Sequence, residues 1–209
     1  MPSSLSSVVR QHLAALRMLL VFSVITGVAY PLALTGIAQG LFAHQANGSL
    51  IKDGGRTVGS SLIGQNFTLP LREGETTGRP DPRWFQPRPP AAGTAGYDPT
   101  ATGASNLGPN DAGLVSTIRQ RRAAVAAFDG VRPETVPADA LTSSGSGIDP
   151  DISKAYAHQQ VARVARARGL SPALVRETVS HHVKSRNVGF LGQQAVNVVE
   201  LNHELAALS

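Results

Sequence analysis

Four histidines are the side chains in this sequence best suited to hold a metal ion: His158, His181, His182 and His203. Adjacent histidines on a helix point about 100° apart, so His181 and His182 are poorly placed to share one ion. The sequence has no H-x-x-x-H or H-E-x-x-H pattern and no cysteine. We therefore expect surface histidines and no bound metal. The lack of cysteine also excludes disulfides, thiolate zinc sites and a cysteine nucleophile.

A second candidate for chemistry is the run Ser143-Ser144-Gly145-Ser146-Gly147, because small residues expose backbone N–H groups that can bind phosphate. A nucleotide P-loop requires Gly-Lys-Ser/Thr at the start of a helix, and this run contains no lysine. The sequence also lacks the G-x-S-x-G pattern of a nucleophile elbow. We interpret the run as a loop, and we predict no catalytic residues and no cofactor bound by this chain.

A third candidate is a helix–turn–helix pattern at residues 154–183, where Gly-Leu-Ser-Pro separates two helical segments that carry Arg163, Arg166 and Arg168. With a net charge of +5 and a pI near 10.2, the pattern permits a membrane-tethered DNA-binding regulator. The same pattern commonly joins two packed helices. The basic residues form no dense run, so the favoured interpretation includes no nucleic acid.

The elements that would position these residues mix helices and strands. Asn110 or Asp111 can cap a helix that runs to about Phe128, a second helix is expected at 152–168, and Ser171-Pro172 is a strong start signal for a third. Strands are expected within 56–67 and at 196–201. This order predicts an α+β domain.

A long loop interrupts this domain between Pro70 and Pro109, where Pro, Gly, Thr and Asp dominate. Trp84, Phe85 and Tyr97 lie within it. Because aromatic side chains in a loop must be buried somewhere, we expect an ordered loop that forms an interaction surface.

The N-terminal part predicts a membrane helix. The stretch from Met18 to Phe42 contains no charged residue, and as a helix it would reach roughly 37 Å, more than the ~30 Å hydrocarbon core. Arg10 and Arg17 precede it, which predicts a cytoplasmic N-terminus. The alternative is a cleaved signal that releases a secreted binding protein or hydrolase, but signal cores are about 7–15 residues and a clean Ala-x-Ala site is lacking.

This stretch has features that a simple anchor does not need. Tyr30-Pro31 should break the helical hydrogen-bond ladder and kink the helix. Gly36 and Gly40 form a G-x-x-x-G spacing, Gly27 is a further small residue, and Gln39 is a polar side chain at a depth where an unpaired amide is costly. We predict a helix that packs against partner helices through these residues.

Together, the expected organisation is a single N-terminal transmembrane α-helix followed by an α+β extracytoplasmic domain. The predicted parts are a cytoplasmic N-terminus (1–17), the transmembrane helix (18–42), a polar juxtamembrane linker (43–55) and the extracytoplasmic domain (56–209).

Motifs along nearly the whole chain, in order, resemble those of the KdpC family, the C subunit of the Kdp potassium-transporting P-type ATPase. The matching segments are Thr26–Leu32, Thr35–Gln39, Gly59–Gln65, Arg83–Phe85, Arg88-Pro89, Tyr97–Pro99, Ser105–Pro109, Thr142–Pro150, Ile152-Ser153, Gln160–Ala165, Val196–Val198 and Leu201-Asn202. The stretch 74–82 and the tail after Glu204 carry little of the pattern.

The resemblance implies an accessory, non-catalytic subunit of a bacterial inner-membrane potassium uptake pump. Its partners would be a channel-like potassium-binding subunit and the catalytic P-type ATPase subunit, which handle potassium and ATP, and the lipid bilayer. The C subunit would stabilise the complex and promote ATP binding by the catalytic subunit. The loops expected to contact partners contain Trp84, Phe85, Tyr97, Asn106, Ser143, Ser144 and Ser146.

Overall fold

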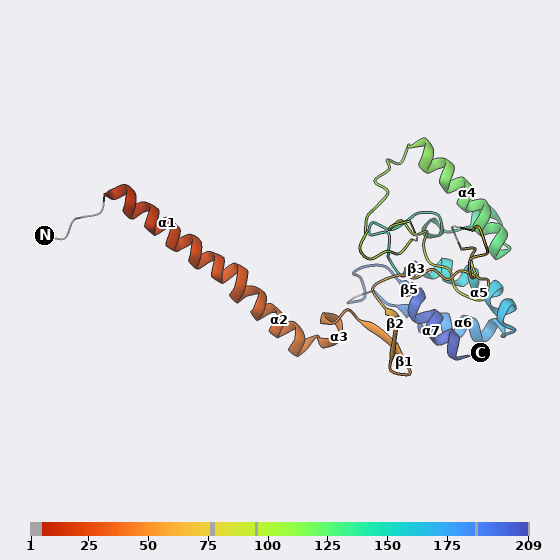
Figure 1. The fold of residues 1–209 in the computed structure, drawn as a ribbon. Helices are drawn as coiled ribbons and strands as arrows, with labels where there is room; N and C mark the ends of the chain where they lie inside the picture. The colour runs from red at the N-terminus through yellow and green to blue at the C-terminus, as the bar shows by residue number, and fades with distance from the viewer. Residues whose placement is uncertain (1–5, 76–77, 95, 187, 209) are drawn as a thin grey trace. The chain divides into compact units, whose positions relative to one another are not determined.

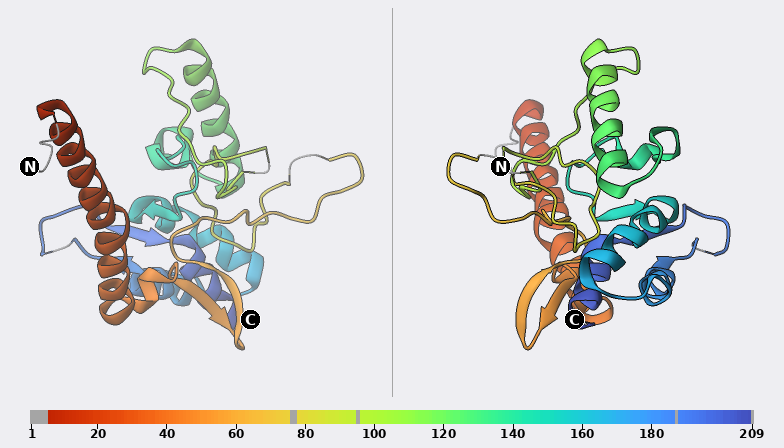
Figure 2. Two further views of the ribbon diagram at one scale, coloured as in Figure 1. Left: turned by 60° about the vertical axis from the view of Figure 1, so that its left-hand side comes forward. Right: turned by 90° about the vertical axis from the view of Figure 1, so that its right-hand side faces the viewer.

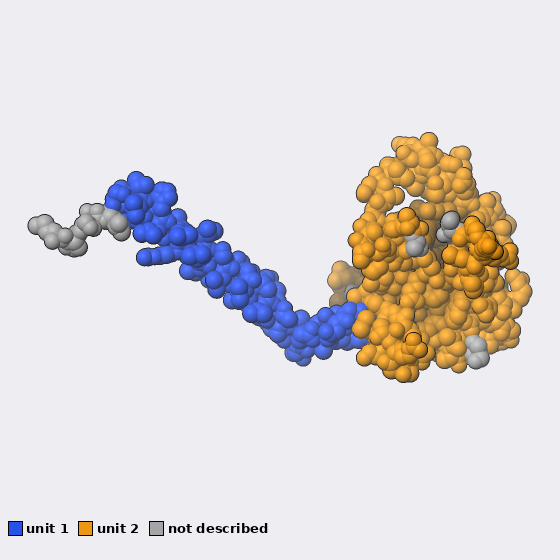
Figure 3. Space-filling view, viewed as in Figure 1, with its two compact units in different colours: residues 1–49 blue, residues 50–209 orange. Residues whose placement is uncertain are grey.

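The computed structural model describes residues 6–75, 78–94, 96–186 and 188–208. The chain divides into two compact units, residues 1–49 and 50–209, shown in different colours in Figure 3. The first unit is helical, and the second contains helices, two small sheets and a long loop region. The α+β architecture expected for the C-terminal part is confirmed.

The first unit is built around one long apolar helix, seen in red and orange in Figure 1. It comprises α1 (Ser7–Val24), the π-helical turn η1 (Ile25–Ala29) and α2 (Tyr30–Leu41), followed by the short α3 (Ala43–Ala46). Residues Ser7–Leu41 are long and apolar enough to cross a membrane, and no residue of α1, η1 or α2 is buried within the unit.

The hydrogen-bond ladder of this helix changes just before Pro31. The Tyr30 amide donates to the Ile25 carbonyl, five residues earlier, where an α-helix would use the fourth. Because Pro31 has no N–H to donate to Gly27, the wider turn accommodates a ladder that is already interrupted. The expected disruption is present, and it takes the form of a π turn one step before the Tyr30-Pro31 pair.

The second unit begins with a hairpin. Strands β1 (Leu50–Asp53) and β2 (Arg56–Ser60) pair antiparallel, with Leu50 opposite Ser60. Gly54 and Gly55 make the turn at φ +52° and +83°, a region that favours glycine. The stretch 43–55, which composition presented as a linker, therefore contains α3 and the first strand of this hairpin.

The remaining elements enclose the core of the second unit. The three-stranded antiparallel sheet has the order β3-β5-β4, and two turns of 3₁₀ helix lie before it in the chain. The bounds are α4 (Ala112–Asp129), η2 (Pro133–Thr135), η3 (Ala138–Ala140), β3 (Asp151–Ser153), α5 (Lys154–Arg168), α6 (Pro172–His181), β4 (Val183–Lys184), β5 (Ala195–Asn197) and α7 (Val198–Ala207).

The helix ends follow their capping residues. Asp111, Ser153 and Ser171 each accept a hydrogen bond from the amide three residues later, at the starts of α4, α5 and α6. Gly130 and Gly169 end α4 and α5 in the left-handed conformation. These three helices are confirmed close to their predicted bounds.

One predicted strand is shorter than expected. The apolar run that begins at Val196 remains extended only to Asn197, and α7 begins at Val198. The reason is Asn197, whose Oδ1 accepts from the amides of Val199 and Glu200 and so caps a helix. A short, mostly apolar segment such as Val196–Leu201 does not distinguish a strand from a buried helix.

The hydrophobic core lies between the sheet and the helices α5, α6 and α7. Its fully buried side chains include Phe85, Val164, Val175, Val196 and Leu201. Helix α4 contributes little to it, since only Ala126 and Asp129 of this helix are buried. Both views of Figure 2 show α4 standing out from the rest of the unit, with its N-terminal half farthest from the core.

Candidate functional site

The loop between Asp81 and Pro90 has no regular secondary structure, yet buried side chains fix it in place. Asn202 of α7 accepts from the Phe85 amide and donates to the Phe85 carbonyl, both at 2.9 Å. Gln160 of α5 does the same for Gln86, at 2.6 and 3.0 Å. Each amide side chain thus pairs with the loop backbone as a neighbouring strand would, which satisfies buried polar groups.

A buried ion pair ties this loop to α4. Arg163 of α5 and Asp129 at the end of α4 are each about 2% exposed, with 2.8 Å between Nε and Oδ1. Arg163 also donates from Nη1 to the carbonyls of Pro82 and Trp84, at 2.7 and 2.9 Å. One guanidinium therefore joins two helices and the loop.

Trp84 lies half-buried between two side chains. The Arg168 guanidinium is 4.1 Å from the centre of its indole ring, and the Phe67 ring is tilted against it at 6.1 Å. Beside it, Asp81 accepts hydrogen bonds from the backbone and side chain of Arg83. These hydrogen bonds lower the pKa of Asp81.

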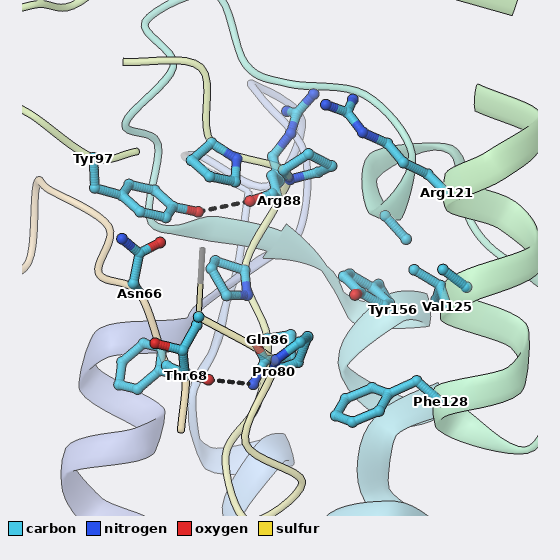
Figure 4. Close-up of a pocket in the computed structure, with 17 residues that line it drawn as sticks. Asn66, Thr68, Pro80, Gln86, Arg88, Tyr97, Arg121, Val125, Phe128 and Tyr156 are labelled. Carbon is cyan, nitrogen blue, oxygen red and sulfur yellow. Dashed lines mark hydrogen bonds between the residues drawn. The ribbon is translucent and has the colours of Figure 1, made fainter. Parts of the chain in front are cut away.

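Tyr97 closes one side of the same region. Its hydroxyl donates to the Arg88 carbonyl at 2.6 Å, as the dashed line in Figure 4 shows. The ring packs against Gly64 so closely that a Cβ there would collide with it. Burial raises the pKa of the Tyr97 hydroxyl, so Tyr97 is a neutral hydrogen-bond donor at physiological pH.

A pocket of about 440 Å³ lies between this loop and α4 (Figure 4). Its wall is mainly aromatic, aliphatic and proline side chains, and two arginines reach it. The lining residues include Phe67, Pro87, Arg88, Tyr97, Arg121, Ala124, Val125 and Phe128. No aspartate or glutamate is among the lining residues in the described part of the chain.

The Ser/Gly loop is held by its own hydroxyls and by Arg88. Ser144 Oγ accepts from the amides of Gly147 and Asp149, at 2.9 and 3.4 Å. Arg88 donates to the carbonyls of Thr142 and Ser143 and lies 3.8 Å from an oxygen of Asp149. Because these amides already have acceptors, the loop does not present the open N–H cradle that a phosphate requires.

Within the described residues, no three His, Cys, Asp or Glu side chains come together in a group that could hold a metal ion. His182 instead lies 3.4 Å from a Glu204 oxygen. His158 is partly buried, which lowers its pKa.

Comparison with known proteins identifies the family to which this chain belongs. The sequence profile described as "KdpC: K+-transporting ATPase, c chain" matches residues 12–207.

The chain belongs to the KdpC family.

Named relatives match along nearly their full lengths, and each is called "Potassium-transporting ATPase KdpC subunit". The protein from Streptomyces coelicolor is 50% identical over all of this chain and 97% of its own length. Those from Gemmatimonas aurantiaca and Mycobacterium tuberculosis are 50% and 45% identical, each over 95% of this chain and 94% and 99% of their own lengths. The chain is accordingly a membrane-associated subunit of a potassium-transporting ATPase.

Membership in the KdpC family argues against the DNA-binding and secreted-protein alternatives. For the DNA-binding alternative, the positions of the arginines give a physical reason. Of the three arginines in the helix–turn–helix pattern, Arg163 is buried against Asp129 and Arg168 is stacked on Trp84. Only Arg166 is exposed. The turn between α5 and α6 joins two packed helices of a KdpC domain.

The residues expected in the KdpC partner loops fall into two groups. Phe85, Tyr97 and Ser144 are buried within the domain itself. Asn106 and Ser146 are exposed, while Trp84 and Ser143 are half-buried. The structure brings Tyr97 and the serines together around Arg88, whereas no described contact joins Asn106 to them.

In the KdpC helix, Gln39 has a partner within its own unit. Its amide and that of Asn47 donate to each other, at 3.3 and 3.1 Å. A Cβ added at Gly27, Gly36 or Gly40 would meet no atom within 4 Å. Gly36 and Gly40 lie four residues apart in α2, so one face of this helix carries no side chain at these two positions.

Sequence reasoning missed the structural roles of the residues that hold the loop or cap α7: Asp129, Gln160, Arg163, Asn197 and Asn202. A signal was available for two of them. Asn197 and Asn202 lie in the segment 195–202, whose only other polar residue is Glu200, and an amide in such a mostly apolar segment must find partners.

Proposed function

We propose that this chain is the single-pass accessory subunit of its potassium pump, with the N-terminus in the cytoplasm and residues 50–209 outside. It stabilises the complex and promotes ATP binding by the catalytic P-type ATPase subunit. A channel-like potassium-binding subunit is the second partner. The supporting observation is the helix Ser7–Leu41, which is apolar, has no buried residue within its unit and carries Arg10 and Arg17 only near its start.

Within this proposal, residues 1–17 lie in the cytoplasm, 18–42 cross the bilayer, and the segment after 42 leads into β1 and the outer domain. The chain contains no cysteine, so topology can be tested with single cysteines introduced at Ser7 and Ala207. A membrane-impermeant maleimide added to spheroplasts should label Ala207→Cys and spare Ser7→Cys until the membrane is opened. The reverse pattern would refute the orientation.

The membrane-helix contacts are proposed to involve Gly27, Tyr30, Pro31, Gly36, Gln39 and Gly40. A glycine face permits a neighbouring helix to approach closely in lipid. Gly36→Leu should therefore reduce co-purification of the other subunits severalfold. Leu34→Phe enlarges a side chain about 160° around the helix and is the matched control. If both variants co-purified the other subunits as well as the unmodified chain does, the glycine face would not be part of the interface.

The partner-contact loops are proposed to act through their exposed members, Asn106 and Ser146, and through the half-buried Trp84 and Ser143. Phe85, Tyr97 and Ser144 hold these loops in shape from inside the domain. The interface itself is the surface that this scaffold presents.

An outer domain cannot reach cytoplasmic ATP, so an effect on ATP affinity has to arise from coupling. The subunit must bind one conformational state of the pump more tightly than another. Potassium-stimulated ATP hydrolysis by the co-expressed complex, with and without this chain, tests the role directly. We expect a higher KM for ATP without the chain, and an unchanged KM with full assembly of the remaining subunits would overturn the ATP part.

A further inference from the structure

We propose that the pocket between α4 and the 86–97 loop binds a single acyl chain that ends in an anionic group, such as a fatty acid or one chain of an anionic phospholipid. This inference concerns a ligand of the outer domain, and it holds or fails independently of the role in ATP binding.

The body of the pocket has the character of an acyl-chain site. Phe67 and Pro87 are among its lining residues. Figure 4 shows Tyr97 on one side of the pocket and Val125 and Phe128 of α4 on the other. A volume of about 440 Å³ falls within the ~300–1,000 Å³ of small-ligand pockets, which are mostly apolar with a few placed polar groups. Removing an acyl chain from water into such a space is favourable.

Positive charge at one end of the pocket favours a negatively charged ligand group. Figure 4 shows the Arg121 side chain reaching from α4 toward Arg88, with both guanidiniums at the same end of the pocket. Arg88 has Asp149 as a partner at 3.8 Å. Arg121 donates from Nη1 to the Leu141 carbonyl at 2.9 Å, but no carboxylate of the described residues lies within ion-pair distance of it.

The residues outside the described part include no Asp or Glu. Arg121 is also half-buried, and desolvation lowers its pKa. A partly desolvated cation beside an apolar pocket is stabilised by an anion that brings its own apolar surface. Helix α4 adds Arg119 and Arg122, with no acidic residue between Asp111 and Asp129, which raises the positive potential there.

Photolabelling can locate the ligand. The full chain in phosphatidylcholine nanodiscs is irradiated with a diazirine-bearing palmitate, and labelled peptides are mapped by mass spectrometry. We expect labels on the segments around Pro87 and Val125, in addition to labels on the membrane helix. Unlabelled palmitate should compete at concentrations at least tenfold lower than hexadecanol, which has the same chain without the charge. Labels confined to the membrane helix, or equal competition by hexadecanol, would overturn the proposal.

Matched variants on α4 test the two halves of the site. Arg121→Gln should reduce pocket labelling at least fivefold and Arg121→Lys should largely restore it, whereas Arg122→Gln, an exposed neighbour, should leave it unchanged. Ala124→Trp places a large side chain in the pocket lining and should abolish labelling, while Ala123→Trp, at a neighbouring position outside the lining, should not. If Ala124→Trp impairs folding, the Arg121 series still decides. Equal labelling of Arg121→Gln and Arg122→Gln would refute the anion site.

Two further arms identify the source and the competing occupant. Phosphatidylglycerol with a diazirine in one acyl chain replaces the free acid: labelling by both indicates a lipid ligand, and labelling by the free acid alone indicates a fatty acid. The assembled pump is then irradiated in the same way. Loss of pocket labelling in the assembled pump, with labelling retained in the isolated chain, would show that a partner segment fills the pocket and would overturn the proposal.

Discussion

Single amide side chains hold the central loop of this domain. Asn202 is 2% exposed, and it satisfies both backbone groups of Phe85, a residue 117 positions earlier in the chain. The aromatic ring of Phe85 is fully buried beside these hydrogen bonds. Loss of the amide would leave a buried N–H and a buried carbonyl without partners, each at a cost of about 1–3 kcal/mol.

We therefore predict that Asn202→Ala lowers the free energy of unfolding by about 2–6 kcal/mol, the sum of these two penalties. Trp84 is the single tryptophan and adjoins Phe85, so its fluorescence during urea unfolding measures the change. Gln120→Ala, at an exposed position of α4, is the control and should change stability by less than about 0.5 kcal/mol. Similar midpoints for both variants would show that Asn202 does not support the loop.

The buried pair of Arg163 and Asp129 gives a prediction about charge. Asp129→Ala leaves the guanidinium buried without its carboxylate and should cost about 3–5 kcal/mol. Adding Arg163→Met removes the unpaired charge, so the double variant should be more stable than Asp129→Ala alone. Urea unfolding of both variants measures the difference. A double variant that is less stable than the single one would mean that the bonds of Arg163 to Pro82 and Trp84 matter more than the ion pair.

The acid dependence of stability follows from Asp81. Hydrogen bonds from Arg83 lower the pKa of this carboxyl in the folded protein, so its contribution is present at neutral pH and is lost as the pH falls below about 4, through the lowered folded-state pKa. Asp81→Asn should be less stable at pH 7, and its stability should fall less steeply on acidification. Parallel curves of unfolding free energy against pH for the two proteins would contradict this assignment.

At the scale of elements, the sequence predicted what local chemistry determines. The starts of α4, α5 and α6 could be predicted because a cap acts within one turn of the helix. The capping residues are Asp111, Ser153 and Ser171, the last followed by Pro172. The start of α7 was missed since Asn197 acts as a cap inside an apolar run, where the strand and helix patterns look alike. The sequence predicted only that the helix would be disrupted near Pro31. Pro31 lacks a backbone N–H donor, but this does not specify which residues form the wider π turn η1.

The Ser/Gly loop offers a matched pair of glycines. Gly147 has φ +73°, and a Cβ there would lie 2.7 Å from the Gly103 carbonyl oxygen. Gly145, two residues earlier, has open space around it and no positive φ. Gly147→Ala should therefore destabilise the domain by about 2 kcal/mol or more, because the left-handed conformation alone costs about 1–2 kcal/mol.

Gly145→Ala is the control and should stay within about 0.5 kcal/mol of the unmodified chain. Limited proteolysis provides a second measurement. Cleavage near 100–105 should accelerate in Gly147→Ala, since the Gly103 amide donates to the Ser146 carbonyl and depends on the same loop geometry. Equal cleavage rates of the two variants would show that the conformation of the segment near 100–105 does not depend on the Ser/Gly loop.

At the scale of the whole molecule, the apolar helix and the α+β domain could be predicted, but the loop scaffold could not. Composition and periodicity describe neighbours in sequence, whereas the bonds of Asn202 to Phe85 and of Gln160 to Gln86 join residues 117 and 74 positions apart. The aromatic residues indicated that the loop is ordered. They did not indicate whether its burial is internal or at a partner surface.

The division into two units leads to a prediction about the isolated second unit. Every side chain of the hydrophobic core lies between Phe67 and Leu205, within the second unit. Residues 50–209 alone should therefore unfold in one cooperative transition, with Trp84 fluorescence like that of the full chain. A broad, non-cooperative transition would show that the first unit is needed for folding.

An anchor exchange then separates attachment from recognition. Fusing residues 50–209 to an unrelated transmembrane helix should return the domain to the membrane. If the glycine face of the native helix contributes contacts, the chimera should nevertheless co-purify the other pump subunits severalfold less than the native chain does, because a generic helix lacks the close-approach surface. Undiminished co-purification would assign recognition to the outer domain alone and leave the native helix as an anchor.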